Sequence, residues 1–242
     1  MTKKTTNNNM EEQDISSGSS EAELPAVGKV NFGDLRRLEP LTRSFGYDRG
    51  RPIDRYYINK FLTQYSTDIA GHVVEIGDDR YIKRFGGNRV TQSDVLDQDH
   101  PDSTPTIIAD LANADHIPTD KFDCIIVIQT LQFIYDVHAA VRTLHRILKP
   151  GGVVLASLPS LSPICRYDMD RWGDYWRFTS AAVQRIFGDI FGSGNITVEA
   201  YGNVLVSTAF LQGMAAEDLT PEELDFKDRD FESLITVRAV EA

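Results

Sequence analysis

The chain has 242 residues, of which 41% are hydrophobic, enough for one large domain with a sizeable core or for two small ones. Its formal net charge of -11 disfavours a nonspecific hold on nucleic-acid phosphates or anionic lipid and favours a small-molecule partner. Two cysteines cannot build a disulfide framework, and no stretch reaches the roughly 18–20 apolar residues that cross a bilayer, so we expect a cytoplasmic protein without a membrane span.

The first 27 residues are rich in Thr, Asn, Ser and Glu and carry hardly any large apolar side chains. A segment of this composition buries too little surface to offset the conformational entropy that folding removes. We therefore predict a disordered tail over residues 1–27 and a single domain over residues 28–242.

Residues 46–57 combine arginines, tyrosines and acids around two glycines, in a locally basic part of an acidic protein. Arginine forks grip carboxylates or phosphates and tyrosine rings stack on flat groups, so this composition suits a loop that folds over a ligand. The alternative is a solvated connector in which the arginines and acids pair with each other. Under the first interpretation, the candidate substrate-binding residues are Tyr47, Arg49, Arg51, Arg55 and Tyr57, and Tyr56 is a candidate general base.

Apolar residues at positions 58, 61, 62 and 65 have helical spacing and predict an amphipathic helix that leads into a strand. That strand, V-V-E-I over residues 73–76, stops at Gly77, and glycine takes a positive φ without steric cost. A tight turn beside a ligand and an ordinary strand end are both consistent with this pattern.

Three more strand-like runs cover residues 89–96, 106–111 and 122–129, and each carries an acid or amide at or near its end. In open α/β sheets, ligands bind beyond the carboxyl ends of the strands, where the strand order switches. An acid at that edge can accept hydrogen bonds from two ribose hydroxyls, and an Asp-Leu pair can hold an adenine. The pattern therefore favours a nucleoside-binding α/β domain.

The clearest helix covers residues 137–148 and ends at K-P-G-G, with basic residues in its last turn. A strand over residues 152–159 follows, and then a second helix for which Thr179 is the predicted N-cap. Two further strands are expected over residues 195–201 and 233–240.

Four motifs follow one another between residues 71 and 159: V-V-E-I-G-D, A-D-L-A-N-A-D-H-I-P, F-D-C-I-I-V-I-Q-T-L-Q-F-I and L-H-R-I-L-K-P-G-G-V-V-L-A. This order resembles the class I S-adenosylmethionine-dependent methyltransferases, and most closely their broad type-11 group. The resemblance implies an α/β fold with a Rossmann-like, mostly parallel sheet of about seven strands, an antiparallel final strand and helices on both faces. It also implies S-adenosylmethionine as the cofactor, bound by Glu75, Gly77, Asp78, Asp94, Val95, Asp110, Leu111 and Gln129.

The roles that the resemblance implies are the methionine moiety for Glu75 and Gly77, the ribose for Asp94, the adenine for Asp110 and Leu111, and the methyl group for Gln129. The sequence departs from the family after Gly77, where D-D-R-Y replaces two further glycines. This departure keeps open a noncatalytic protein of the same fold that binds a nucleoside or a protein partner. An NAD-dependent enzyme is disfavoured because no G-x-G-x-x-G follows the first strand.

Residues 168–179 follow the fifth strand and hold both tryptophans of the chain among acids and arginines. A sugar or aromatic acceptor needs such a flat apolar face with charged hydrogen-bond partners. The alternative is that the tryptophans anchor a lid. The acceptor-binding candidates here are Trp172, Trp176 and Arg177, and the candidate general bases are Asp168 and Asp174.

We therefore expect an O-methyltransferase that acts on a small-molecule acceptor, a hydroxyl of a sugar or glycan precursor, without nucleic acid and without a metal. The domain divides into an N-terminal lid and helix over residues 28–70, a cofactor-binding core over 71–159, and an acceptor loop with C-terminal strands over 160–242. Neither the methylated atom nor the oligomeric state follows from the sequence.

Overall fold

The computed structural model of the protein describes residues 24–98 and 104–242. Most of the predicted disordered tail over residues 1–27 therefore lies outside the described residues. Contacts within the chain divide it into two units, Met1–Arg37 and Leu38–Ala242.

The first unit holds one 3-10 turn among its described residues, η1 (Gly33–Leu35). Beside it, the guanidinium of Arg36 lies 5.7 Å from the centroid of the Phe32 ring, a cation–π contact. The division after Arg37 falls inside residues 28–70, which the sequence analysis treats as one segment.

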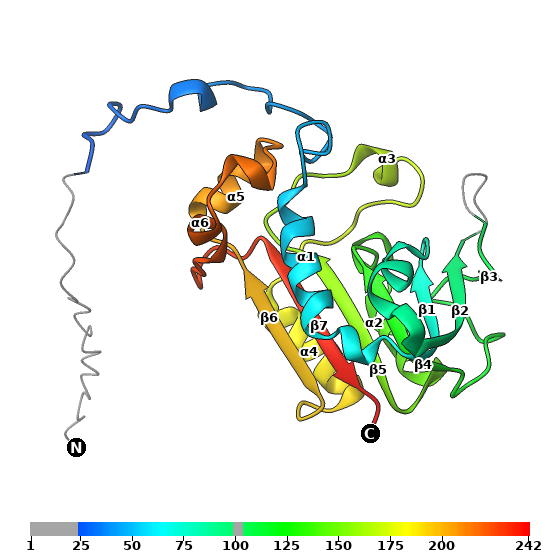
Figure 1. Cartoon of the computed structure of the whole chain (residues 1–242). Helices are drawn as coiled ribbons and strands as arrows, with labels where there is room; N and C mark the ends of the chain where they lie inside the picture. Colours follow the sequence, from blue (N-terminus) through cyan, green and yellow to red (C-terminus); the bar gives the residue numbers. More distant parts are fainter. Residues whose placement is uncertain (1–23, 99–103) are drawn as a thin grey trace, which may run out of the picture. The chain divides into compact units, whose positions relative to one another are not determined.

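The second unit is built on a sheet whose described strands follow the order β3-β2-β1-β4-β5-β7-β6 (Figure 1). The five strands from β3 to β5 pair in parallel, whereas β7 is antiparallel to both of its neighbours. This topology confirms the predicted mostly parallel sheet with an antiparallel final strand. The strands are β1 (Gly71–Ile76), β2 (Val90–Asp97), β3 (Ile107–Ile108), β4 (Phe122–Ile128), β5 (Leu148–Pro159), β6 (Ile196–Tyr201) and β7 (Leu234–Val240).

Four of the six described α-helices begin at a side-chain cap. The predicted N-cap Thr179 accepts a hydrogen bond from Ala182 N, and Thr220 forms a capping box with Glu223. The α-helices are α1 (Ile53–Gln64), α2 (Val137–Ile147), α3 (Arg166–Met169), α4 (Ser180–Phe191), α5 (Val204–Leu211) and α6 (Pro221–Asp225). Single turns are η2 (Ser66–Asp68), η3 (Ile82–Gly86), η4 (Gly87–Arg89), η5 (Leu131–Phe133) and η6 (Ala216–Asp218).

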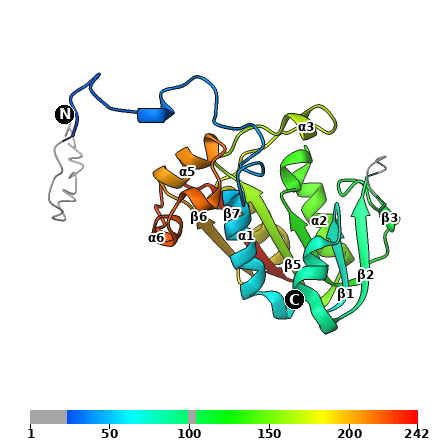
Figure 2. The same ribbon diagram turned by 45° about the horizontal axis from the view of Figure 1, so that its top comes forward.

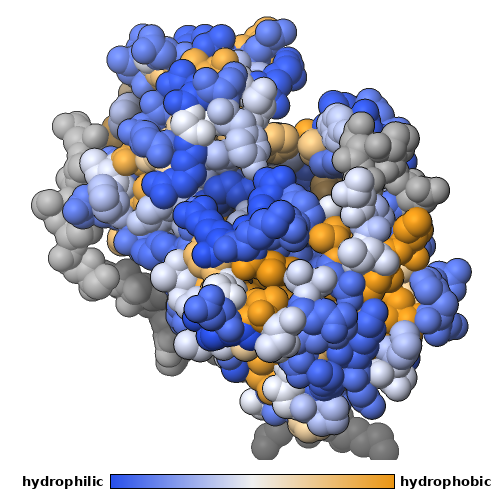
Figure 3. All heavy atoms as spheres, turned by 45° about the vertical axis from the view of Figure 1, so that its right-hand side comes forward, coloured by the Kyte–Doolittle hydropathy of each residue, from blue (hydrophilic) through white to orange (hydrophobic). Residues whose placement is uncertain are grey.

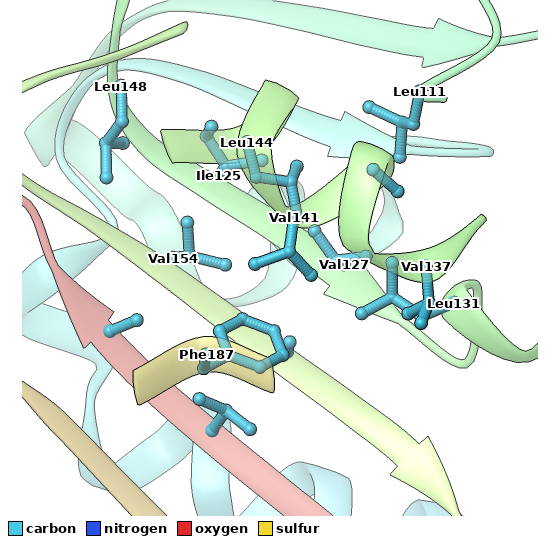
Figure 4. Close-up of a cluster of buried hydrophobic side chains, with 14 of the residues drawn as sticks. Leu111, Ile125, Val127, Leu131, Val137, Val141, Leu144, Leu148, Val154 and Phe187 are labelled. Atoms are coloured by element: carbon cyan, nitrogen blue, oxygen red, sulfur yellow. The ribbon is translucent and has the colours of Figure 1, made fainter. Parts of the chain in front are cut away.

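Each face of the sheet carries its own apolar core, because successive strand residues point to opposite faces. Ile125 and Val127 of β4 belong to the cluster that includes α2 and α4, and Figure 4 shows them with Phe187 of α4. Cys124 and Ile126, their neighbours along β4, belong to the second cluster with residues of α1 and α5. The sheet is therefore covered by helices on both faces, as predicted.

The run expected as a strand over residues 106–111 pairs only over β3 (Ile107–Ile108). The chain turns immediately afterwards, because the Asp110 carboxylate accepts a hydrogen bond from Ala112 N. Between β1 and β2 the chain forms η3, a π-helical turn, followed by η4.

The carboxyl ends of the parallel strands lie on one side of the sheet. In Figures 1 and 2 the arrows of β1 and β2 point toward the side on which the loop carrying α3 lies. In the register, Ile76 at the end of β1 is level with Leu96, and Ile128 at the end of β4 is level with Ser157. This arrangement brings the strand ends and the α3 loop, residues 160–179, to a common edge.

The surface seen from the side of β1–β3 is mostly hydrophilic, with apolar atoms in smaller groups (Figure 3). Among the helices of residues 24–98 and 104–242, none combines the length and the apolar character needed to cross a bilayer.

Candidate active site

Two cavities open at the edge where the parallel strands end. The first, here called the strand-end cavity, has a volume of about 280 Å³. It is lined by Ile76, Gly77, Leu96, Asp97, Gln98, Ala109, Leu111, Ile128, Gln129, Thr130, Phe133, Ile134, Asp168 and Trp172. The second, here called the loop cavity, has a volume of about 210 Å³. It is lined by Phe45, Tyr47, Asp54, Arg55, Ile128, Gln129, Gln132, Phe133, Pro159, Ser162, Pro163, Cys165, Asp168, Asp174, Arg177, Phe210, Ser233 and Leu234.

The strand-end cavity contains a glycine turn, an apolar slot and an acid. Gly77 has φ +92°, and no other atom lies within 4 Å of the position that a Cβ would take there. Leu96 and Leu111 are 1% and 3% exposed, so their side chains form buried walls. Asp97 is the last residue of β2. A flat apolar group and a hydroxylated group can both be accommodated by such a lining.

Glu75 lines neither cavity but holds the segment that follows Gly77 through hydrogen bonds to its backbone. Its side chain is 2% exposed, and its carboxylate accepts hydrogen bonds from Tyr81 N at 3.0 Å and Ile82 N at 2.9 Å. Burial raises the pKa of Glu75 to about 8, although these two hydrogen bonds act in the opposite direction. Glu75 therefore fixes the path of the chain after Gly77.

Of the residues that replace the glycines after Gly77, Asp78, Asp79 and Arg80 are at least partly exposed, whereas Tyr81 is buried. Asp78 accepts hydrogen bonds from Arg80 Nε at 2.7 Å and from Arg80 N at 2.9 Å, and both side chains are largely exposed. Asp79 pairs with Lys83 at 2.8 Å. The departure from a glycine-rich motif thus produces a self-paired surface loop and leaves the space above Gly77 open.

Asp94, the residue predicted for the ribose, does not line the strand-end cavity. Its carboxylate is bound by His72 Nε2 at 2.7 Å and Thr106 Oγ1 at 2.7 Å, with Lys121 Nζ at 3.6 Å. Burial alone would raise the pKa of Asp94, but these hydrogen bonds and the Lys121 charge hold it below its usual range. In the sheet, Asp94 pairs with Val74, two residues before the end of β1.

The other predicted cofactor contacts divide between the cavity and its surroundings. Gly77, Leu111 and Gln129 line the strand-end cavity together. Val95 pairs with Glu75 in the sheet, and Asp110 is exposed in the turn beside Leu111, so neither lines the cavity.

Gln129 lies in the wall that the two cavities share. It has φ +52°, and its backbone N–H donates to Ser157 O at 3.1 Å, which holds the turn at the end of β4. Gln132 Nε2 donates to Gln129 O at 2.9 Å. The other residues common to both cavities are Ile128, Phe133 and Asp168.

Of the three predicted general bases, Asp168 and Asp174 line the loop cavity. The side chain of Asp174 is 1% exposed. Arg177 donates to both of its carboxylate oxygens, from Nη1 to Oδ1 at 2.6 Å and from Nη2 to Oδ2 at 2.8 Å. Arg177 also donates to Pro163 O, so this pair secures the loop that carries α3. Asp168 lies beside Cys165, and burial together with that carboxylate raises the pKa of the Cys165 thiol to about 11.

The first turn of α1 contributes a charged pair to the loop cavity. Arg55 Nη1 lies 3.6 Å from Asp54 Oδ2, and Arg55 Nε donates to Tyr47 Oη at 2.9 Å. Burial raises the pKa of the Asp54 carboxyl, while the Arg55 charge opposes that rise. Tyr47 and Arg55, both predicted substrate-binding residues, therefore lie together in the cavity.

Other members of the predicted loop over residues 46–57 lie outside both cavities. Arg49 pairs with Asp218 at 3.1 Å, and Arg51 lies 3.7 Å from Glu217. Both arginines pair with acids, as the solvated-connector alternative expects, but these acids come from the far end of the chain and not from the loop itself. Both contacts attach the loop to the segment around η6.

Tyr56 and Tyr57 line neither of the two cavities. Tyr56 Oη donates to Asp225 at 3.0 Å. Tyr57 is 1% exposed, donates to Leu224 O at 2.6 Å and stacks on Tyr201 at 5.2 Å between ring centroids. The structure thus separates Tyr56 from Asp168 and Asp174.

The two tryptophans occupy different positions. Trp172 lines the strand-end cavity and not the loop cavity. Trp176 lines neither, because its Nε1 donates to Ile134 O at 3.1 Å and its ring stacks on Tyr135 at 5.9 Å. Trp176 therefore acts as an anchor of the α3 loop, in line with the lid alternative.

Sequence reasoning missed several lining residues. Asp97 lies three residues after the predicted Asp94. It could have been chosen as the ribose ligand because it is the second acid of the D-V-L-D run. Gln132 lies within the motif over residues 122–134 and Asp54 within the loop over residues 46–57, but neither was named as a site residue. Phe45 and Phe210 come from distant segments. Only the packing of these segments brings them to one cavity.

The sheet order, the glycine turn after β1 and the cavity at the carboxyl edge together define a class I methyltransferase fold. A family model described as a methyltransferase domain matches residues 38–193, which is more than half of the chain. The protein belongs to this family, which confirms the predicted class I S-adenosylmethionine-dependent methyltransferase and its cofactor.

Solved structures share the fold at low sequence identity. A SAM-dependent methyltransferase from Archaeoglobus fulgidus is 10% identical, with a TM-score of 0.51 over 77% of this chain and 94% of that one. The N-methyltransferase NodS from Bradyrhizobium japonicum, solved with S-adenosyl-L-homocysteine, is 13% identical, with a TM-score of 0.50 over 84% and 94%. The [4+2]-cyclase SpnF is 14% identical, with a TM-score of 0.51 over 84% and 89%. No curated protein sequence matches the chain.

Proposed function

We propose that the protein transfers a methyl group from S-adenosylmethionine to a hydroxyl of a small polar acceptor, such as a sugar or glycan precursor. The observation that carries this proposal is that two cavities share one wall, formed by Ile128, Gln129, Phe133 and Asp168. Two substrates held on either side of a shared wall can present their reacting atoms to each other.

The strand-end cavity fits the cofactor. The free space at Gly77 admits a ligand close to the backbone, and the buried Leu96 and Leu111 walls suit an adenine. For the ribose hydroxyls we propose Asp97, which lines the cavity, in place of Asp94, whose carboxylate is bound by His72 and Thr106. When bound, S-adenosylmethionine supplies an electrophilic methyl group.

The remaining task of the protein is to orient the acceptor and to remove its proton. Asp168 is the acid that lines both cavities, so we propose that its carboxylate accepts the proton of the reacting hydroxyl. Asp174 is a poor candidate because Arg177 binds both of its oxygens. Apolar side chains, among them Phe45, Phe133 and Phe210, limit water around the reacting atoms.

The lining of the loop cavity supports a polar acceptor. It combines aromatic and proline side chains with carboxylates, arginines and two glutamine amides. Sugars have both apolar C–H faces and hydroxyl edges, and they match such a lining better than a wholly apolar molecule does. A hydroxyl also suits Asp168, since a carboxylate is a base for an oxygen acceptor.

Two measurements test the proposal. Isothermal titration should show binding of S-adenosylmethionine and S-adenosylhomocysteine, and methyl-labelled S-adenosylmethionine should label a neutral sugar or sugar conjugate in an acceptor panel. If neither S-adenosylmethionine nor S-adenosylhomocysteine binds at millimolar concentration, the cofactor assignment is refuted. Labelling of amines only would refute the O-methylation.

A second candidate is a protein of this fold that does not transfer methyl groups. The self-paired Asp78–Arg80 loop in place of the glycine-rich motif favours it. In addition, the solved neighbour SpnF is a [4+2]-cyclase, so the fold is not restricted to methyltransferases. Tight binding of S-adenosylhomocysteine without turnover over the whole acceptor panel would favour this candidate.

A further inference from the structure

Three buried polar atoms that lack a hydrogen-bond partner come from residues of the loop cavity. They are Asp54 Oδ1, Arg55 Nη1 and Gln132 Oε1. The other atoms of this kind in the described part of the chain belong to Gln212 and Glu241, which line neither of the two cavities. Buried polar atoms are nearly always paired, so three exceptions around one cavity indicate groups that a ligand completes.

Asp54 and Arg55 are held near each other without satisfying each other. The separation of 3.6 Å between Arg55 Nη1 and Asp54 Oδ2 exceeds the usual length of a hydrogen bond. Tyr47 Oη meanwhile accepts from Arg55 Nε and holds the guanidinium in place. One hydrogen-bond donor on Arg55 and one acceptor on Asp54 therefore remain available to a third group.

Gln132 supplies the second acceptor, and its orientation is fixed. Its side chain is 4% exposed, and Nε2 donates to Gln129 O at 2.9 Å and lies 3.3 Å from Gln129 Oε1. Both of these partners are acceptors, so the amide nitrogen of Gln132 must face them. Its Oε1 is thereby turned away from Gln129 and is left without a donor.

A ligand that completes this set has to offer at least two donors and one acceptor. A carboxylate or phosphate would satisfy Arg55, but it would be repelled by Asp54 and would have no proton for Gln132. An ammonium group would satisfy Asp54 and Gln132, but Arg55 would repel it. Neighbouring hydroxyl groups donate and accept at once and carry no charge.

We infer that Asp54, Arg55 and Gln132 form a subsite that binds two adjacent hydroxyl groups of a neutral acceptor. This inference rests on the proposed function, because the subsite lies in the cavity assigned to the acceptor. Small side-chain rotations on binding bring the three atoms to the ligand, as active-site hydrogen bonds often tighten only in the complex. Gln132 of the subsite donates to Gln129 O, and Gln129 belongs with Asp168 to the wall that the two cavities share.

The test compares sugars that differ in one group. Binding of neutral methyl hexopyranosides, the matched hexuronic acids and the matched 2-amino sugars is measured by saturation-transfer NMR on the full chain, with and without S-adenosylhomocysteine. We expect the neutral diols to bind at least about tenfold more tightly than either charged series, because a charged group leaves buried atoms unpaired. Equal binding of the three series, or binding of none, would overturn the inference.

Variants sharpen the test. Asp54→Asn removes the charge at constant shape, so it should weaken the neutral diols about tenfold and improve the hexuronic acids relative to them. Gln132→Leu should weaken the neutral diols without changing that charge preference. The matched control is Asp189→Asn, which removes an exposed carboxylate of α4 that pairs with Arg185, and should change neither series.

The two proposals can fail separately. If the wild-type chain does not bind S-adenosylhomocysteine, the proposed function is refuted. The sugar series measured without cofactor still tests the subsite in that case. Conversely, an Asp54→Asn variant that binds S-adenosylhomocysteine normally is folded, and unchanged sugar selectivity in that variant would refute the subsite alone.

Discussion

The strand-end cavity and the loop cavity share a wall but are assembled in different ways. Apart from Asp168 and Trp172, the strand-end cavity is lined by residues 76–134, which are the ends of successive parallel strands and the turns that follow them. The loop cavity draws on five separate parts of the chain, from Phe45 to Leu234. The first site therefore follows from strand register, and the second depends on how distant segments pack.

The largest expected effect lies where the two cavities meet. Asp168→Asn should lower kcat by about 10²- to 10⁴-fold, because the acceptor proton loses its base. The dissociation constant of S-adenosylhomocysteine should stay unchanged, since an amide keeps the shape of the wall. Steady-state kinetics with the best acceptor of the panel measures the first quantity and titration calorimetry the second.

The matched control for this variant is Asp170→Asn, in the same loop but in neither lining. It should keep full activity. If Asp168→Asn retained the wild-type kcat, Asp168 would not be the base, and the shared wall would serve only to position the substrates.

A second expected effect concerns the support of the strand-end cavity. Burial raises the pKa of Glu75 to about 8 in the folded protein, against an ordinary value of 4.5. The folded state therefore retains a proton that the unfolded chain releases, so this contribution to stability is complete below pH 4.5 and is lost as the pH rises to 8. Across that window the unfolding free energy of the wild type should fall by roughly 3–5 kcal/mol relative to Glu75→Gln.

Thermal or urea unfolding of both proteins at a series of pH values measures this difference, and the comparison cancels the titration of all other groups. Parallel stability curves from pH 4.5 to 8 would mean that Glu75 is ionised in the folded state. Its two backbone hydrogen bonds would then outweigh the effect of burial.

The third expected effect tests the open space at Gly77. Gly77→Ala places a methyl group where we propose that the cofactor lies, in a backbone conformation with φ +92°, and should weaken S-adenosylhomocysteine binding by about tenfold or more. Gly151→Ala introduces similar backbone strain at φ +78°, in a residue that lines neither cavity. Equal affinity in the two variants, measured by calorimetry, would place the cofactor away from Gly77.

The smallest expected effect separates two acids of β2. Asp97→Asn should weaken S-adenosylhomocysteine binding by about tenfold, because hydrogen bonds from ribose hydroxyls to a charged acceptor are replaced by neutral ones. Asp94→Asn should leave that affinity unchanged and lower the unfolding free energy by about 1 kcal/mol, through its bonds to His72 and Thr106. The reverse pattern would restore the ribose role to Asp94.

The sequence by itself determined the main strands and helices and a minority of the residues that line the strand-end cavity. Apolar runs of strand length set β1, β4 and β5, and side-chain caps and glycine stops set α2 and α4, because these signals act within a few neighbouring residues. Gly77, Leu111 and Gln129 line one cavity, since strand ends in a parallel sheet share an edge, and their roles toward the cofactor stay predictions.

Only the tertiary structure decided which acid of β2 lines the strand-end cavity. Asp94 and Asp97 are three positions apart and so face opposite sides of the strand, and the packing places Asp97, at the strand end, in the cavity. The tertiary structure also decided that Arg49 and Arg51 pair with acids near residue 217 while Arg55 lines the loop cavity. Contacts between residues far apart in the chain leave no periodic trace in the sequence, since each depends on where whole segments pack.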